Sequence, residues 1–306
     1  MSDNTIVKHE QGLEQLKQLV TDSLTSLNSR VAYDKALTDF LAWYQSTGQR
    51  GLIKATVAEY KTYLQGLGYA PSTINQRLSA IRRLALEAAD NGLMDAQLAN
   101  GVARVKGVKS SGVRTGNWLN KEQAQRLLDA PDIKTLKGLR DRAILAVMLG
   151  AGLRRSEVAA LTFEHIQQRE GRWVIVDLIG KGKRVRTVPI PSWAKQAIDE
   201  WTQTAGISEG RIFRAVNKGD RLAGESLTSQ AVQDVVKLYA KQCGFELAAH
   251  DLRRTFAKLA RKGGADLMQI QLTLGHASVK TTERYLGENQ DLTSAPCDVL
   301  GLKLYQ

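Results

Sequence analysis

Apolar residues in the first hundred positions recur at the spacing of helices, without the alternation typical of strands. In residues 28–48, Asn28 can cap a helix that ends at Thr47 and Gly48, and its apolar positions are Val31, Leu37, Phe40, Leu41 and Tyr44. In residues 71–92 a second stripe at positions i, i+4, i+7, i+11 and i+14 consists of Ile74, Leu78, Ile81, Ala85 and Ala88. The pattern predicts that this part of the chain is helical.

Helical spacing also dominates the rest of the chain, but one segment has a strand pattern. Residues 172–178 and 184–190 are rich in apolar and β-branched side chains and flank the tip Gly180-Lys-Gly-Lys183, which is typical of a β-hairpin. Pro189 and Pro191 end or edge the second strand. Helices are predicted at residues 119–130, 136–149, 156–161, 192–204, 229–242, 251–262, 266–274 and 278–285. We therefore predict a mostly α-helical protein with one small β-sheet or hairpin.

The 306 residues suffice for two domains of ordinary size, and charge is divided unevenly along them. Residues 1–100 hold 10 Lys+Arg and 10 Asp+Glu, whereas residues 101–306 hold 33 and 21, so the net charge of +12 lies in the second part. Residues 96–121 contain no acidic side chain but several Gly, Ser and basic residues. We predict a helical domain over residues 1–100, a basic linker over 101–116 and a second domain over 117–306.

Composition excludes several classes of protein. The chain is 43% hydrophobic and 24% charged, which is typical of a globular protein. It has no run of about 18 apolar residues and no secretory signal, so we expect a cytoplasmic protein that does not cross a membrane. Two cysteines, Cys243 and Cys297, argue against a disulfide framework. A pI near 9.7 favours a polyanionic partner, although a basic surface could serve nucleic acid, anionic lipid or solubility.

Short motifs in the second part carry residues suited to chemistry at a phosphate. Arg154 lies where two predicted helices join, and His250 and Arg253 are spaced i and i+3 on one helix face. His276 follows Leu-Gly, and Tyr285 lies nine residues further on. Breaking a phosphodiester requires cations that neutralise its growing charge, a nucleophile, and an acid for the leaving oxygen. Each of these residues taken alone is more often a surface charge or a packed side chain.

Taken together and in this order, the motifs resemble the tyrosine recombinase (phage integrase) family. The resemblance rests on GLRRSE, GKGKRVRTVPIP, HDLRRTFA and LGHASVKTTERY. It covers about residues 115–290 directly, and the helical region before the linker resembles the family's core-binding domain more loosely. The resemblance implies a two-domain C-shaped clamp, in which a helical core-binding domain precedes an α+β catalytic domain. It also implies an enzyme that cuts and rejoins DNA.

The family's phosphate cage can be placed residue by residue. The resemblance implies that Arg154 and Arg253 clamp the non-bridging oxygens of the scissile phosphate, a task suited to their fixed charge and forked donors. His250 and His276 complete the cage, and Glu157 is a supporting residue that orients its neighbours. All six of the family's catalytic positions are matched, so catalytic activity is expected.

The remaining two catalytic positions supply the nucleophile and the acid. By the resemblance, Tyr285 attacks the phosphate and forms a covalent 3′-phosphotyrosyl bond, which a second strand can resolve without ATP, metal or cofactor. Lys181 is the family's general acid for the leaving 5′ oxygen. Lys183 lies two residues further along the same hairpin tip and is the rival candidate for this role.

Basic residues before and within the linker are candidates for DNA binding. A second stripe on the helix of residues 71–92 is more simply a solvated face, although it could contact a DNA backbone. The candidate contacts are Arg82, Arg83, Arg104, Lys106 and Lys109. The resemblance further implies double-stranded DNA with short inverted-repeat sites, a homotetramer on two such sites, accessory DNA-bending or directionality proteins, and association with the nucleoid.

Some features leave the assignment open below the level of the family. Arg254 stands where chromosomal Xer-type recombinases often have His, which weakens assignment to that subgroup. Residues 288–306 carry apolar side chains, and in the family such a tail docks on a neighbouring protomer. A type IB topoisomerase would share the chemistry, and a non-catalytic DNA-binding protein could share the scaffold. The target DNA, the biological role and a host or mobile-element origin are not encoded in these motifs.

Overall fold

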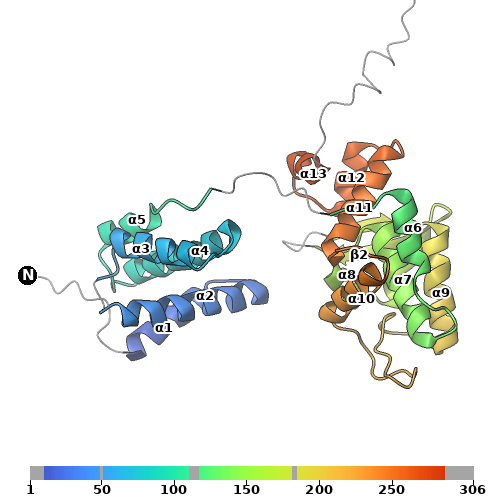
Figure 1. The fold of residues 1–306 in the computed structure, drawn as a ribbon, viewed down its shortest axis with the longest axis horizontal. Helices are drawn as coiled ribbons and strands as arrows, with labels where there is room; N and C mark the ends of the chain where they lie inside the picture. The colour runs from blue at the N-terminus through green and yellow to red at the C-terminus, as the bar shows by residue number, and fades with distance from the viewer. Residues whose placement is uncertain (1–9, 49–50, 110–116, 181–184, 287–306) are drawn as a thin grey trace, which may run out of the picture. The chain divides into compact units, whose positions relative to one another are not determined.

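The computed structural model describes residues 10–48, 51–109, 117–180 and 185–286. The chain divides into two compact units, Met1–Val113 and Arg114–Gln306, which are described separately (Figure 1). Helices make up most of both units, and the described strands form one small antiparallel sheet in the second. The predicted fold class, mostly helical with a small sheet, is confirmed. No helix in the described ranges is long and apolar enough to cross a membrane.

The N-terminal unit is built around one central helix, α4. Its described helices are α1 (Glu10–Asp22), α2 (Leu27–Ser46), α3 (Lys54–Gly66), α4 (Pro71–Asp90) and α5 (Ala96–Ala103). Helix α4 packs against the other four, and the whole predicted stripe on it is buried: Ile74, Leu78, Ile81, Ala85 and Ala88. The apolar period of this segment therefore predicted both the helix and its buried face.

Helix α2 differs from the prediction at its start. It begins at Leu27 after Ser26, so that Asn28 lies inside the helix and does not cap it. Val31 is 63% exposed, whereas Leu37 is buried. The step of six positions from Val31 to Leu37 turns the helix by about 240°, which places Val31 off the buried face.

Helix α5 was not predicted, because residues 96–103 lack charge and include a glycine, which weakens a helical pattern. The carboxylate of Asp95 caps its first turn by accepting hydrogen bonds from the backbone amides of Gln97 and Leu98. The stretch read as linker from the sequence therefore starts inside a helix.

The C-terminal unit consists of helices and one small sheet. Its elements are α6 (Lys121–Asp129), α7 (Leu136–Ala151), α8 (Arg155–Ala160), the 3-10 turn η1 (Phe163–His165), β1 (Ile166–Arg169), β2 (Arg172–Ile179), β3 (Val185–Pro189), α9 (Ser192–Ala205), α10 (Ser229–Gln242), α11 (Ala249–Lys262), α12 (Leu267–Leu274) and α13 (Val279–Leu286). The strands pair in the order β1-β2-β3, with Ile175 opposite Val188 in the predicted hairpin. Strand β1 was missed, because four mostly polar residues show no alternation that favours a strand.

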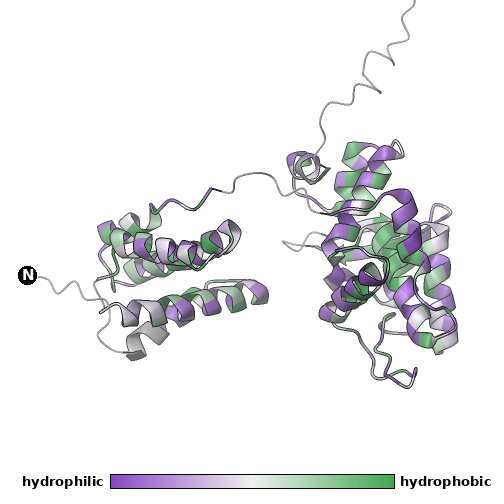
Figure 2. Ribbon diagram, in the orientation of Figure 1, coloured by the Kyte–Doolittle hydropathy of each residue, from purple (hydrophilic) through white to green (hydrophobic). Residues whose placement is uncertain are grey.

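Helix α7 is the centre of the C-terminal unit. Its residues from Ala143 to Met148 are all fully buried, and it packs against α6, α9, α10 and α11. Figure 2 shows this helix coloured as hydrophobic over much of its length. A helical segment that is apolar on every side is stable only inside a protein, and the neighbouring helices cover this one.

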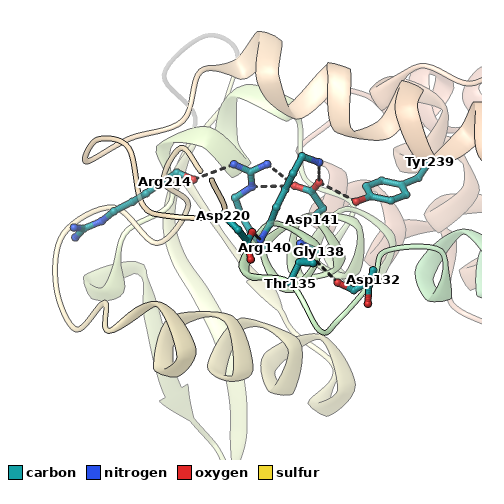
Figure 3. Close-up of polar contacts among 9 residues, drawn as sticks. Asp132, Thr135, Gly138, Arg140, Asp141, Arg214, Asp220 and Tyr239 are labelled. Atoms are coloured by element: carbon teal, nitrogen blue, oxygen red, sulfur yellow. Dashed lines mark hydrogen bonds and ion pairs between the residues drawn. The ribbon is translucent and has the colours of Figure 1, made fainter. Parts of the chain in front are cut away.

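One carboxylate inside this core anchors α7 to its surroundings. Asp141 is fully buried and accepts hydrogen bonds from Arg140 Nε at 2.9 Å, Lys137 Nζ at 2.5 Å and the Tyr239 hydroxyl at 3.0 Å (Figure 3). Burial and the negative charge of Asp141 raise the pKa of Tyr239 well above its ordinary value, so the hydroxyl stays a donor. Asp220 accepts two backbone N–H groups at the first turn of α7. These contacts fix the helix that leads into the Gly-Leu-Arg motif.

Candidate active site

The turn after α7 places the first arginine of the site. Gly152 ends α7 with φ of 61°, and a Cβ at this position would lie 2.6 Å from the Phe256 ring. Only glycine satisfies both the left-handed backbone and this close approach. Leu153 is then buried, and Arg154 follows directly before α8 with a partly exposed side chain. The short Gly-Leu-Arg sequence therefore directs the guanidinium of Arg154 out of the core.

Glu157 holds Arg154 in place from within α8. Its carboxylate accepts hydrogen bonds from the Arg154 amide at 2.8 Å and from Arg154 Nη1 at 2.7 Å. It also accepts two bonds of 2.9 Å from the guanidinium of Arg186 on β3. Burial alone would raise the pKa of Glu157, but the bonds from Arg186 and the Arg154 amide outweigh burial and hold the pKa below its ordinary value. Glu157 is therefore ionised near pH 7 and lies between two arginines.

Arg253 and His250 lie one turn apart on α11. Arg253 is only 1% exposed, and its guanidinium donates from Nη1 to the Gly152 carbonyl at 2.6 Å and from Nη2 to the Leu274 carbonyl. His250 lies closer to solvent, where partial burial and then the charge of Arg253 lower its pKa below the ordinary value. The predicted i, i+3 pair thus sits on one face of the helix, with its arginine fixed by backbone carbonyls.

His276 follows the end of α12. Gly275 terminates this helix with φ of 62°, and Gln271 then bonds His276 through both its side chain and its carbonyl at 3.2 Å. The Nδ1 atom of His276 lies 3.0 Å from the hydroxyl of Thr282 on α13. Burial, followed by the charges of Arg253 and Arg154, lowers the pKa of His276 to about 4. The imidazole is therefore neutral near pH 7.

Three of the predicted cage residues line one cavity of about 340 Å³. The cavity is lined by Leu153, Arg154, Arg155, Ser156, Gln233, Ala249, His250 and Arg253. His276 lies near enough that Arg253 and Arg154 lower its pKa. Forked cations and an imidazole around a space of this size are suited to holding the oxygens of a phosphate. Among the described residues, no group of three or more His, Cys, Asp or Glu could hold a metal ion.

The predicted nucleophile and acid are only partly described. The backbone of Tyr285 lies in α13, which packs against α11 and α12 and so lies beside the helix of Arg253 and the helix that leads to His276. The side chain of Tyr285 lies outside the described residues. Lys181 and its rival Lys183 also lie outside them, although strands β2 and β3 on either side are described.

Among the predicted DNA-contact residues of the N-terminal unit, Arg82 bonds the protein backbone and the other four are exposed. Arg82 donates to the Val105 carbonyl, and Asn75 bonds both the amide and the carbonyl of Val108 at 2.8 and 2.9 Å. A Cβ on Gly107 would lie 2.5 Å from Asn75 Oδ1, so the chain approaches α4 closely there. The residues left exposed are Arg83, which pairs with Glu87, and Arg104, Lys106 and Lys109. Arg82 and Asn75 therefore hold Val105 and Val108 against α4.

Arg186 is a site residue that the sequence analysis missed. It lies on β3 two positions before the buried Val188, so strand alternation places both side chains on the same face of the sheet. Side-chain alternation along a strand places this charged residue on the buried face, which predicts a buried ion pair. This signal was present in the sequence, and the partner, Glu157, is one of the predicted residues.

Comparison with known proteins agrees with this geometry. Residues 117–291 match the phage integrase family, and residues 13–92 match the phage integrase N-terminal SAM-like domain. The chain therefore belongs to the phage integrase family of tyrosine recombinases, enzymes that cleave and rejoin DNA. Recombinases among its relatives disfavour the two alternatives, a type IB topoisomerase and a non-catalytic DNA-binding protein.

Similar proteins include both Xer types. Tyrosine recombinase XerC of Myxococcus xanthus is 31% identical over 260 residues, which cover 81% of this chain and 83% of that protein. XerD of Pseudomonas aeruginosa is 29% identical over 264 residues, covering 84% and 86%. Among solved structures, XerH bound to difH substrate has a TM-score of 0.66 at 20% identity, covering 93% of this chain and 82% of that one. A lambda integrase dimer on a core site has a TM-score of 0.67 at 16% identity, covering 91% and 96%. These structural likenesses establish the fold.

Proposed function

We propose that the chain performs site-specific recombination through a covalent 3′-phosphotyrosyl intermediate, with Tyr285 as the nucleophile. The phenol loses its proton as its oxygen attacks phosphorus, the bond from phosphorus to the 5′ oxygen breaks, and that oxygen takes up a proton from a general acid, so one proton is lost and one is gained. The 5′ hydroxyl of another strand then attacks the phosphotyrosine and displaces the tyrosine. Each step exchanges one phosphoester bond for another, so no ATP is consumed. The observation that carries the proposal is the single cavity shared by Arg154, His250 and Arg253.

The cage would act by stabilising charge that grows on the scissile phosphate. Arg253 is held by two backbone carbonyls and Arg154 by Glu157, so neither guanidinium has to reorganise when the phosphate arrives. Such preorganised donors contribute most to lowering a barrier of this kind. His276 is neutral in the free protein and would act on the phosphate as a hydrogen-bonding group.

Lys181 is the proposed proton donor to the leaving 5′ oxygen. An alkoxide is a poor leaving group, so a general acid is needed to protonate it as the bond breaks. The resemblance assigns the first lysine of Gly-Lys-Gly-Lys to this role, and Lys183 is the alternative. In the rejoining step the same residue, then neutral, would take the proton from the attacking 5′ hydroxyl.

Both units are proposed to bind the DNA. The net charge of +12 supports a grip on the phosphate backbone, with Arg83, Arg104, Lys106 and Lys109 as exposed contacts in the N-terminal unit. We further propose a homotetramer on two short inverted-repeat sites, with accessory DNA-bending or directionality proteins, acting at the nucleoid in the cytoplasm. The domain limits proposed for this assembly are residues 1–100, 101–116 and 117–306.

Residues 288–306 are proposed to link neighbouring protomers. They lie outside the described residues, but the C-terminal unit has a surface that could bind such a segment from a second copy. This surface is a groove of about 560 Å³ between α6, α7 and α9, and its apolar lining includes Leu128, Leu149 and Trp193. Charged side chains, among them Lys121 and Glu200, also line this groove.

Covalent trapping on a nicked duplex tests the proposed function. The duplex carries a binding site selected from a random library with the full chain, and its nick lets the short cleaved fragment diffuse away. The unchanged protein should form a protein–DNA adduct, Tyr285→Phe should bind DNA but form none, and Tyr305→Phe is the matched control that should still form it. An adduct from Tyr285→Phe at the normal yield would refute Tyr285 as nucleophile. DNA binding without any adduct from the unchanged protein would refute the catalytic proposal.

A further inference from the structure

Arg186 is almost fully buried, and its guanidinium donates hydrogen bonds to two separate segments of the C-terminal unit. Its side chain is 8% exposed. Two of its nitrogens, Nη1 and Nη2, each donate to a different oxygen of Glu157 at 2.9 Å, and Nε donates to the Thr273 carbonyl at 2.8 Å. Bidentate pairing of this kind fixes orientation as well as distance. One side chain on β3 therefore holds both α8 and the end of α12.

Both segments that Arg186 holds carry residues of the site. The Glu157 carboxylate accepts hydrogen bonds from the backbone amide and the guanidinium of Arg154. By holding this carboxylate, Arg186 also fixes the position of Arg154. Thr273 lies three positions before His276, at the end of α12. The Arg186 contacts thus join the first arginine of the cage to the helix end that leads to its second histidine.

The α12 end is shaped to accept the Arg186 side chain. A Cβ on Gly275 would lie 2.9 Å from Arg186 Cδ, closer than carbon atoms normally approach. Gly275 also has φ of 62°, which disfavours other residues. Arg186 therefore packs where a side chain at position 275 would stand, directly before His276.

A purely structural ion pair would explain why Arg186 and Glu157 are buried, but not why Arg186 contacts both α8 and the end of α12. Replacing a buried ion pair with apolar side chains is often neutral or stabilising, so stability alone does not require an arginine here. We propose that Arg186 is a positioning residue that sets Arg154 and His276 relative to each other around the scissile phosphate. This inference rests on the proposed function, and it assigns Arg186 a role that lies beyond the six residues of the cage, acid and nucleophile.

The test compares Arg186→Met with Arg169→Met, a matched control on β1 of the same sheet whose arginine is exposed and bonds its neighbour Gln167. The DNA dissociation constant and the single-turnover rate of adduct formation are measured on two nicked duplexes carrying the selected site. One has the ordinary scissile phosphate, and the other has a neutral methylphosphonate there. A neutral linkage carries no charge for a guanidinium to offset, so it depends less on the position of Arg154.

We expect Arg186→Met to leave the DNA dissociation constant unchanged and to slow cleavage of the phosphate by about 10- to 100-fold, in line with the effect of a misplaced catalytic group. Its defect should be clearly smaller on the methylphosphonate. Arg186→Lys keeps the charge but cannot span all three acceptors, so it should be intermediate on the phosphate. It also provides the test if Arg186→Met does not fold.

Three outcomes would overturn the inference without touching the proposed function: cleavage by Arg186→Met at the rate of Arg169→Met, equal defects on both substrates, or a loss confined to DNA affinity. Ile198→Val, a core substitution on α9, shows how much the rate falls from lost stability alone. If the unchanged protein forms no adduct on the phosphate duplex, the proposed function itself fails.

Discussion

Binding of DNA should transfer a proton to His276. In the free protein, burial and the charges of Arg253 and Arg154 lower its pKa to about 4. A scissile phosphate in the cage places a negative charge beside the imidazole. At a separation of roughly 5 Å and an effective dielectric constant near 20, two unit charges interact by about 3 kcal/mol, or roughly two pKa units. Because His276 is partly exposed, solvent screening reduces this, and we expect a rise of about one to two units.

The assay is calorimetry of DNA binding in two buffers that differ in ionisation enthalpy, which reports the protons taken up. At pH 5.5, where the free imidazole is neutral and the bound one is partly charged, about half a proton should be taken up, and almost none at pH 8. His276→Gln should clearly reduce this uptake, and the double variant His250→Gln/His276→Gln should reduce it further, because the pKa of His250 is also lowered in the free protein and His250 lines the same cavity. If the unchanged protein took up no protons at pH 5.5, or if His276→Gln took up as many as the unchanged protein, His276 would not be the group that gains the proton.

The same pKa fixes the sign of a stability effect in the free protein. The folded pKa of about 4 lies below the unfolded value of 6.5, so the unfolded chain binds more protons between these values. His276 therefore destabilises the fold progressively as pH falls from 6.5 towards 4, and has no further effect below that. Urea unfolding at several pH values should show a smaller loss of stability for His276→Gln over this range.

Three further changes have defined outcomes. Lys181→Ala should cleave the ordinary duplex about a hundredfold or more slowly. Its cleavage should recover when sulfur replaces the bridging 5′ oxygen, since a thiolate leaves without protonation. If sulfur rescued Lys183→Ala instead, Lys183 would be the general acid. Asp141→Ala should lower the free energy of unfolding by about 3–5 kcal/mol, because it leaves Arg140 buried without its anion. Tyr239→Phe removes one hydrogen bond and should lower it by about 1 kcal/mol. Equal losses of the two variants in urea unfolding would contradict this. Asn75→Ala should speed hydrogen exchange at the Val108 amide by removing its acceptor, and unchanged exchange would contradict the contact.

The sequence predicted what depends on local period and on motif order. The stripe on α4, the β2-β3 hairpin and the helices around it follow from side-chain spacing within one element. The residues Arg154, His250 and Arg253 were predicted from motifs, and the structure brings them to one cavity. Helix α5 and strand β1 were missed because each is short and lacks a clear apolar pattern, so their stability comes from packing within the unit.

Contacts between distant segments could not be predicted in the same way. Nothing near Arg186 indicates that its partners are Glu157, 29 positions earlier, and Thr273, 87 positions later. Arg82 was a candidate DNA contact because it lies on the polar side of α4, yet its guanidinium binds the Val105 carbonyl. In both cases the partner is set by the tertiary fold, which spacing along one helix or strand does not record.

The most direct test of the account is to identify the residue that becomes linked to DNA. The adduct trapped on the nicked duplex is digested with nuclease and trypsin, and the peptide that retains a nucleotide is sequenced by mass spectrometry. Trypsin cleaves after Arg284 and next after Lys303, so we expect the nucleotide on the peptide 285–303, or on an overlapping one if cleavage beside the modified residue fails. Fragmentation should place the phosphate on Tyr285, the sole tyrosine of that peptide. A nucleotide on any other peptide, such as the one that contains Tyr239, would contradict the account.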